Sequence, residues 1–133
     1  MAYNERIQSI SLAADESVGK YTGVPGQPGS ASPNSGMQYR FVKVTGKSQC
    51  GLATAAADRV VGVLQNKPQY PGTAATVGIF GVTLLTAGAA VDAGDPVESD
   101  SEGRAVTSAG AGVGVALTAS ANAGELISVL LGL

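Results

Sequence analysis

The sequence Val61-Gly62-Val63, followed by Gly72 and Val77, recurs as Val113-Gly114-Val115, followed by Gly124 and Val129. The offset is 52 residues at all five positions. A short β-branched run, a step to a glycine and a second apolar run are typical of a strand, a connection and a return strand. The pattern indicates two copies of one β unit, although five matches can also arise by chance in a chain rich in glycine, alanine and valine.

Further short apolar runs, separated by turn residues, lie on both sides of this pattern. No stretch carries capped apolar residues at helical spacing, although the alanine-rich segment 52–58 could form one or two helical turns. The expected strands cover residues 39–44, 59–64, 76–84, 97–98, 104–107, 112–117 and 125–131. We therefore expect a mostly β fold, with residues 38–133 forming one β domain that the repeat would divide into two related units.

Glycines inside these runs indicate how the sheet is shaped. Gly62, Gly78, Gly81 and Gly114 each weaken a flat strand by about 0.5–1 kcal/mol relative to alanine. Bulges, strong coiling and close backbone contacts need residues without a Cβ. The sequence therefore predicts a small rolled β-barrel or β-sandwich.

The N-terminal segment, residues 1–37, has a different composition. Ile10 and Leu12 alternate with serines and predict one short strand, whereas residues 22–36 are rich in glycine, proline and serine. A segment with so little apolar surface gains order only by lying on another surface. We therefore expect residues 1–37 to form an extended N-terminal arm and linker.

Composition excludes several classes of function. The 133 residues suffice for one domain, only 14% of them are charged, and there is no histidine. A Ser-His-Asp triad, a histidine-ligated metal site and a histidine pH switch therefore cannot be built. Cys50 is the only cysteine, and Gln49 and Gly51 offer no base to activate it. We expect no enzymatic activity, no cofactor and no bound metal.

The charges are few and unevenly distributed. Residues 1–67 carry a net charge of +3, and residues 68–133 carry −5. The basic residues stand singly without interleaved aromatics, so we expect no nucleic-acid binding. The uncharged stretch 68–91 contains too many prolines and glycines for a membrane span, and the first ten residues lack the apolar core of a secretory signal. The charge difference could let one end of a subunit attract the other end of a neighbour.

Two motifs with possible chemistry have simpler interpretations. Five acids between residues 92 and 102 resemble a calcium loop, but the position of the bidentate ligand is occupied by Ala109 and no helices flank the loop. A solvated turn accounts for them better, and paired carboxylates without a tryptophan give a poor sugar-cleaving site. The glycine-rich stretch 110–114 lacks the Lys-Ser/Thr of a phosphate loop. The acids are Asp92, Asp95, Glu98, Asp100 and Glu102.

Residues 59–131 resemble the small capsid decoration, or cement, proteins of tailed bacteriophages. The resemblance rests on the runs 61–64, 77–82 and 87–97 and on the ending 113–131. It implies a β-rich structural protein on the outer surface of the capsid, made in the host cytoplasm. By analogy, the protein would be a homotrimer that binds the major capsid protein and stabilises the shell.

If the N-terminal arm orders on the capsid, its main chain would supply hydrogen bonds and its larger side chains would fill pockets. The expected capsid-contacting residues are Tyr3, Arg6, Ile7, Ile10, Leu12, Tyr21 and Tyr39. The alternative is a receptor-binding or carbohydrate-binding β module of a virion fibre or surface structure. Six scattered phenylalanines and tyrosines give little support to a sugar-binding face.

Overall fold

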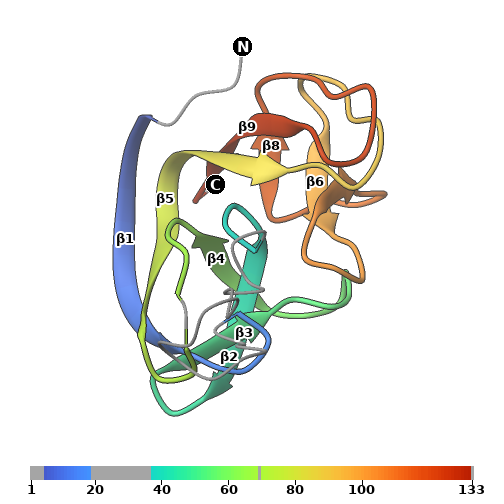
Figure 1. Ribbon diagram of the computed structural model, residues 1–133. Helices are drawn as coiled ribbons and strands as arrows, with labels where there is room; N and C mark the ends of the chain where they lie inside the picture. The colour runs from blue at the N-terminus through green and yellow to red at the C-terminus, as the bar shows by residue number, and fades with distance from the viewer. Residues whose placement is uncertain (1–4, 19–36, 69, 133) are drawn as a thin grey trace, which may run out of the picture.

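The computed structural model describes residues 5–18, 37–68 and 70–132. These residues form nine strands in one sheet and no helix, which confirms the mostly β fold (Figure 1). The strands are β1 (Glu5–Ala14), β2 (Phe41–Gly46), β3 (Gln49–Leu52), β4 (Val60–Leu64), β5 (Ala74–Thr86), β6 (Pro96–Ser99), β7 (Ala105–Thr107), β8 (Gly114–Ala116) and β9 (Leu126–Leu131).

The sheet rolls into two rings that share β5. Its strand order is β1-β3-β2-β4-β5-β9-β8-β6-β7, and an additional pairing of β1 with β5 closes the first five strands into a ring. On the other side, a bridge between Ala87 and Ala105 brings the chain after β5 to β7. β5 is the longest strand because its first half belongs to one ring and its second half to the other.

The N-terminal segment requires a correction. We expected residues 1–37 to lie outside the β domain, but β1 runs antiparallel to β5 from Glu5 to Ala13 and parallel to β3 at Ala13 and Ala14. Ala14 and Val18 are fully buried. Main-chain pairing, which does not depend on side-chain composition, therefore places residues 5–18 in the sheet, while residues 19–36 lie outside the described part of the chain.

The repeated sequence forms two hairpins with one register. In the first hairpin, Leu64 of β4 lies opposite Val77 of β5, and in the second, Ala116 of β8 lies opposite Val129 of β9. Leu64 and Ala116 are 52 residues apart, and so are Val77 and Val129, which is the offset of the repeated sequence. The hydrogen bonds that follow also correspond, since Gln65 N donates to Thr76 O at 2.7 Å and Leu117 N donates to Ser128 O at 2.8 Å.

The correspondence extends to every strand of the two rings. The β2–β3 pair and the β6–β7 pair share one register at an offset of 55 residues, as in Val42 opposite Leu52 and Val97 opposite Thr107. The pairing of β1 with β5 likewise matches that of β5 with β9. We call residues 5–80 the first unit and residues 81–132 the second unit, and we call residues at the same ladder position equivalent.

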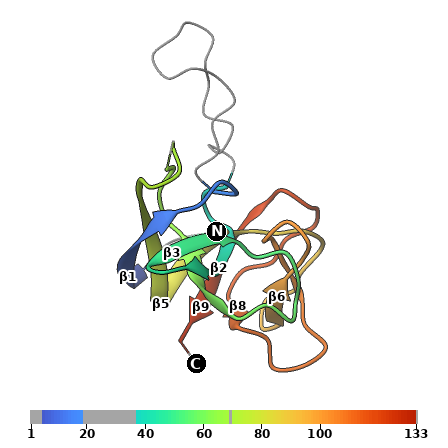
Figure 2. The same cartoon turned by 90° about the horizontal axis from the view of Figure 1, so that it is seen from below.

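Equivalent strands of the two units run in opposite directions. The first strand of the first unit, β1, runs antiparallel to β5, whose second half is the first strand of the second unit. Superposing the units therefore reverses the strand direction, as a two-fold rotation does. In Figure 2, β1 and β5 lie on the opposite side of the molecule from β6.

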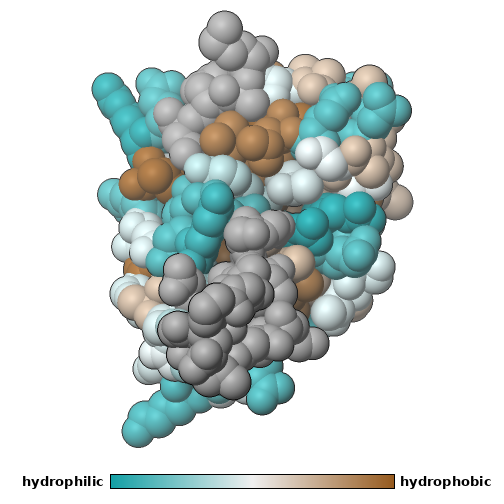
Figure 3. Space-filling model, in the orientation of Figure 1, coloured by the Kyte–Doolittle hydropathy of each residue, from teal (hydrophilic) through white to brown (hydrophobic). Residues whose placement is uncertain are grey.

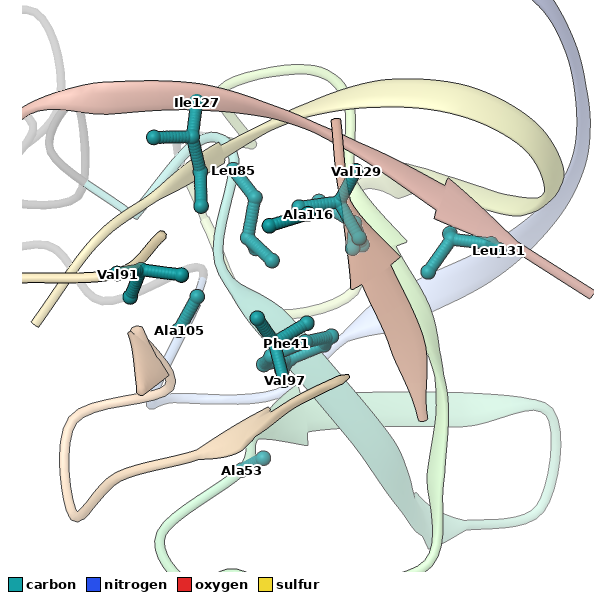
Figure 4. Close-up of a cluster of buried hydrophobic side chains, with 11 residues drawn as sticks. Phe41, Ala53, Leu85, Val91, Val97, Ala105, Ala116, Ile127, Val129 and Leu131 are labelled. Carbon is teal, nitrogen blue, oxygen red and sulfur yellow. The ribbon is translucent and has the colours of Figure 1, made fainter. Parts of the chain in front are cut away.

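Each unit has its own hydrophobic core. The core of the first unit is made of Ala14, Val18, Val42, Cys50, Leu64, Ala75 and Val77. The equivalent residues of the second unit are all buried as well, and most join one cluster (Figure 4). That cluster also takes in Phe41, Ala53 and Val63 from the first unit, so the second core extends across the junction.

Close backbone approach explains two of the strand glycines. A Cβ on Gly62 would collide with the carbonyl oxygen of Gly78, and one on Gly114 would lie 2.8 Å from the carbonyl oxygen of Leu130. The expectation that strand glycines mark a tightly rolled sheet is confirmed at these equivalent positions.

The segment 52–58 does not form the helical turns that we considered. β3 ends at Leu52, and a turn follows whose carboxylate, Asp58, accepts hydrogen bonds from Thr54 N at 2.8 Å and from Lys43 Nζ at 2.9 Å. These bonds lower the pKa of Asp58 to about 2, with the backbone bond from Thr54 as the largest cause. Alanine content favoured a helix locally, but the pairing of β3 with β2 ends in a capped turn instead.

Candidate interaction surfaces

β1 brings four of the expected capsid-contacting residues onto one strand. Arg6 is exposed and Ile10 is 42% exposed, so both side chains are free to contact a partner. Ile7 is partly buried because its side chain covers Gly78, where a Cβ would come within 2.9 Å of it. Leu12 packs against the core of the first unit and has a structural role.

Tyr39 lies away from β1 and anchors the start of β2. Its N–H donates to Leu64 O at 2.7 Å, and its carbonyl accepts from Thr86 N at 2.7 Å. Its φ of 63° is matched by the φ of 93° at Gly94, the equivalent residue, so a left-handed residue is needed at this ladder position in both units. Tyr3 and Tyr21 lie outside the described residues.

Within the described residues, the backbone of β1 has one paired edge and one edge that is open over most of its length. Ala14 N donates to Thr73 O at 2.9 Å on the side of β5, whereas Ala13 N donates to Ser48 O at 2.8 Å on the side of β3. Backbone groups alternate sides along a strand, so the N–H and C=O groups of Ser9 and Ser11 point away from β5.

Few features protect this open edge. Among residues 5–18, 37–68 and 70–132, β1 has a partner on that side only at Ala13 and Ala14. The stretch from Ile7 to Ala14 contains no charge and no proline, which are common protections of edge strands, although a register shift occurs between Gln8 and Ser9. An extended segment of another protein could therefore pair with β1 at Ser9 and Ser11.

A groove of about 250 Å³, lined by apolar residues and by their polar backbone groups, lies between the two units. Two equivalent pairs line it, Val61 with Val113 and Ile79 with Leu131. Ile79 is 36% exposed, Val113 is 38% exposed, and the adjoining Phe80 is 52% exposed. Figure 3 shows hydrophobic side chains at the surface over the region where β5 and β9 run in Figure 1. The groove is completed by Val60, Gly62 and Gly132.

The acids between residues 92 and 102 serve the turns around β6. Asp100 Oδ2 accepts from Arg104 Nε at 2.9 Å, and Asp100 Oδ1 accepts from the N–H of Glu102 and of Arg104 at 2.8 Å each. Asp95 accepts from Thr107 Oγ1 at 3.1 Å. In the described part of the chain, no three residues of metal-binding type come together.

The thiol of Cys50 is fully buried in the core of the first unit. Burial is the main cause that raises its pKa to about 11, and the nearby Asp15 carboxylate adds to the effect. A thiol with this pKa is almost entirely protonated at neutral pH and is a poor nucleophile.

The described residues contain no helix that is long and apolar enough to cross a membrane. What they do present is an open strand edge, an apolar groove and a shell of turns around two small cores. These features are typical of a structural protein that works through contact surfaces.

Comparison with known proteins identifies the family. Residues 37–132 match the family model of the phage cement proteins, and the chain belongs to that family. It is a phage structural protein associated with the capsid, as the resemblance implied. No curated protein matches the chain.

A solved structure shows the same fold. The chain is similar to the head fiber gp8.5 N base of bacteriophage phi29, with a TM-score of 0.60 and 16% sequence identity over 95% of this chain and 94% of that one.

Sequence reasoning missed the groove and the open edge. The groove joins residues that are distant in sequence, and the pairing of β5 with β9 brings them together. The repeat did hold a usable signal, because Val61 and Val113 are equivalent. Apolar residues that reach the surface at repeated positions point to a junction between units.

Proposed function

We propose that this protein decorates the outer surface of the assembled capsid and reinforces the shell as a homotrimer that binds the major capsid protein. Membership of the phage cement family is the observation that carries the proposal. A protein that binds the assembled lattice, and not free subunits, stabilises that lattice by mass action. Enzymatic activity is no part of the proposed role.

The open edge of β1 supports a specific mode of contact. An extended capsid segment would pair with the outward backbone groups of Ser9 and Ser11, while Arg6 and Ile10 contact its side chains. The sequence predicted the same element as the contact, but as an arm that orders on the capsid. In the present proposal β1 is already folded, so binding does not pay the entropy of ordering it.

Binding to purified particles tests the proposal. Wild-type protein should sediment with expanded, undecorated capsids and remain in the supernatant with proheads or free capsid subunits. Lysine at edge positions blocks strand addition, so Ser9→Lys/Ser11→Lys should lose at least about tenfold in affinity with its thermal unfolding little changed. Ser101→Lys/Ala109→Lys adds the same charge at exposed sites in the second unit and should bind normally.

The outcomes separate the candidate roles. Equal binding by Ser9→Lys/Ser11→Lys would exclude the edge of β1 as the contact. The phi29 neighbour is the base of a head fiber, which keeps a receptor-binding or carbohydrate-binding module as the second candidate. Binding to glycans or cells without binding to capsids would favour that candidate and contradict capsid decoration.

A further inference from the structure

The second unit carries an exposed apolar pair that the first unit lacks. Leu117 is 36% exposed and Leu126 is 45% exposed. Leu117 N donates to the carbonyl of Ser128, two residues from Leu126, so the two leucines occupy diagonal positions of the ladder. The equivalent residues of the first unit are Gln65 and Ala74, so the shared fold does not require leucine at either position.

The leucine pair and the apolar groove lie at opposite ends of one ladder. Leu126 begins β9, and Leu131, which ends β9, lines the groove. Five residue steps of an extended strand separate the two by about 17 Å. A second copy that covered the groove would therefore leave the leucine pair of the first copy free for a third.

A basic residue lies at the groove and an acidic residue adjoins the leucine pair. Arg59 precedes Val60 at the groove, whereas Arg6, whose carbonyl lies against Gly81, is offset by the adjacent Glu5, which pairs with Val82. Both arginines are exposed, and neither has an ion pair with any described residue.

One acid adjoins Leu126, and a second lies near the loop that follows Leu117. Glu125 precedes Leu126 and is exposed, and Asp92 follows Val91, which bridges to Ser120 in the same loop region. Neither carboxylate has an ion pair within the described chain. Over all described residues, the first unit has a net charge of +2 and the second unit −5.

We propose that the groove between the units receives the Leu117–Leu126 edge of a second copy of this chain, so that subunits associate head to tail. Apolar contact at the centre and an Arg59–Glu125 pair at the rim match the usual anatomy of a subunit interface. A heterologous contact of this kind closes into a ring when its rotation allows it. The inference deepens the proposed function, because it supplies the interface of the proposed homotrimer.

Sedimentation velocity of the full chain tests the interface. Wild type should be oligomeric, and Leu117→Gln/Leu126→Ala, which installs the residues of the first unit, should be monomeric with an unchanged circular dichroism spectrum. Arg59→Glu and Glu125→Arg should each weaken association by about tenfold, and the double variant should restore it. Lys47→Glu, which reverses an exposed charge away from the groove, should associate normally.

A monomeric wild type, an oligomeric Leu117→Gln/Leu126→Ala, or a double charge variant no better than the single ones would overturn this interface. Capsid binding is a separate readout. A monomeric protein that still binds expanded capsids would refute the interface and leave capsid decoration standing. If the variants change the oligomeric state as expected but the protein does not bind capsids, the interface would stand and capsid decoration would be refuted.

Discussion

At the outer end of the ladder between its last two strands, the second unit has Leu117 and Leu126, where the first unit has Gln65 and Ala74. At the edge of its first strand away from β5, the first unit has no described partner at Ser9 and Ser11, whereas in the second unit the equivalent stretch of β5 is covered at Val82 by Glu5. The backbone pairings are shared and the exposed positions differ. Each unit therefore offers a different surface, and our proposals assign the first to the capsid and the second to a neighbouring subunit.

The cores show the same relation between shared register and different residues. The first unit has Leu64 and Ala75 where the second has Ala116 and Ile127. A large and a small residue have changed places between two neighbouring strands, which keeps the packed volume nearly constant. Most other equivalent core positions hold the same residue in both units, as at Val42 and Val97, so only this exchanged pair and the pair of Cys50 with Ala105 differ.

The largest loss of stability is expected from substitution of Phe41. This residue starts β2 of the first unit but is buried in the core of the second. Phe41→Ala should lower the free energy of unfolding by about 3–5 kcal/mol. Both units should then lose stability together in one urea transition. Val44→Ala, at a 56% exposed site on the same strand, is the control and should cost little. A transition in which only one unit is weakened would show that the two cores are independent.

Exchange of core residues between the units should give the next largest effect. Leu64→Ala alone leaves a cavity and should cost about 2–5 kcal/mol, and Ala75→Ile alone overpacks the core at a cost of about 1–3 kcal/mol. The double variant reproduces the second unit and should recover at least about 1 kcal/mol relative to the sum of the single changes. Urea unfolding of all four proteins measures this coupling, and strict additivity would contradict the proposed equivalence.

The sequence predicted the repeat, the β class and most strand positions, because β-branched runs and turn glycines carry that information locally. It did not predict that β1 belongs to the sheet. The alternation of Ile10 and Leu12 with serines predicted only a short isolated strand, and main-chain pairing with β5 leaves no trace in composition. Of the expected contact residues, Arg6 and Ile10 are exposed and their contact with the capsid stays a prediction, whereas Leu12 and the backbone of Tyr39 hold the fold together.

Substitution of either of two turn glycines should have a smaller effect on stability, and the effect should be the same at both positions. Gly72 and Gly124 are equivalent, have φ of 90° and 91°, and have no atoms in reach of an added Cβ. Alanine at either position should cost about 1–2 kcal/mol through backbone strain alone. Thermal unfolding of the two variants compares the turns directly. A difference of more than about 1 kcal/mol between them would mean that the turns are not equivalent.

The smallest expected effect is on the pH dependence of alkylation of Cys50, the residue equivalent to Ala105. Because burial raises the pKa of this thiol to about 11, the rate of its alkylation in the folded protein should still rise with pH well above pH 9. The same measurement in urea should give the higher rate and lower pKa of an exposed thiol. A rate that levels off near pH 9 in the folded protein would show that the first core is open to solvent.

Reinforcement of the shell is the central claim, and the temperature at which filled, expanded, undecorated particles release their DNA measures it directly. Addition of this protein should raise that temperature in a saturable way, and Ser9→Lys/Ser11→Lys should need a higher concentration to do so. An unchanged release temperature at saturating, bound protein would contradict the account, because the molecule would then coat the capsid without strengthening it.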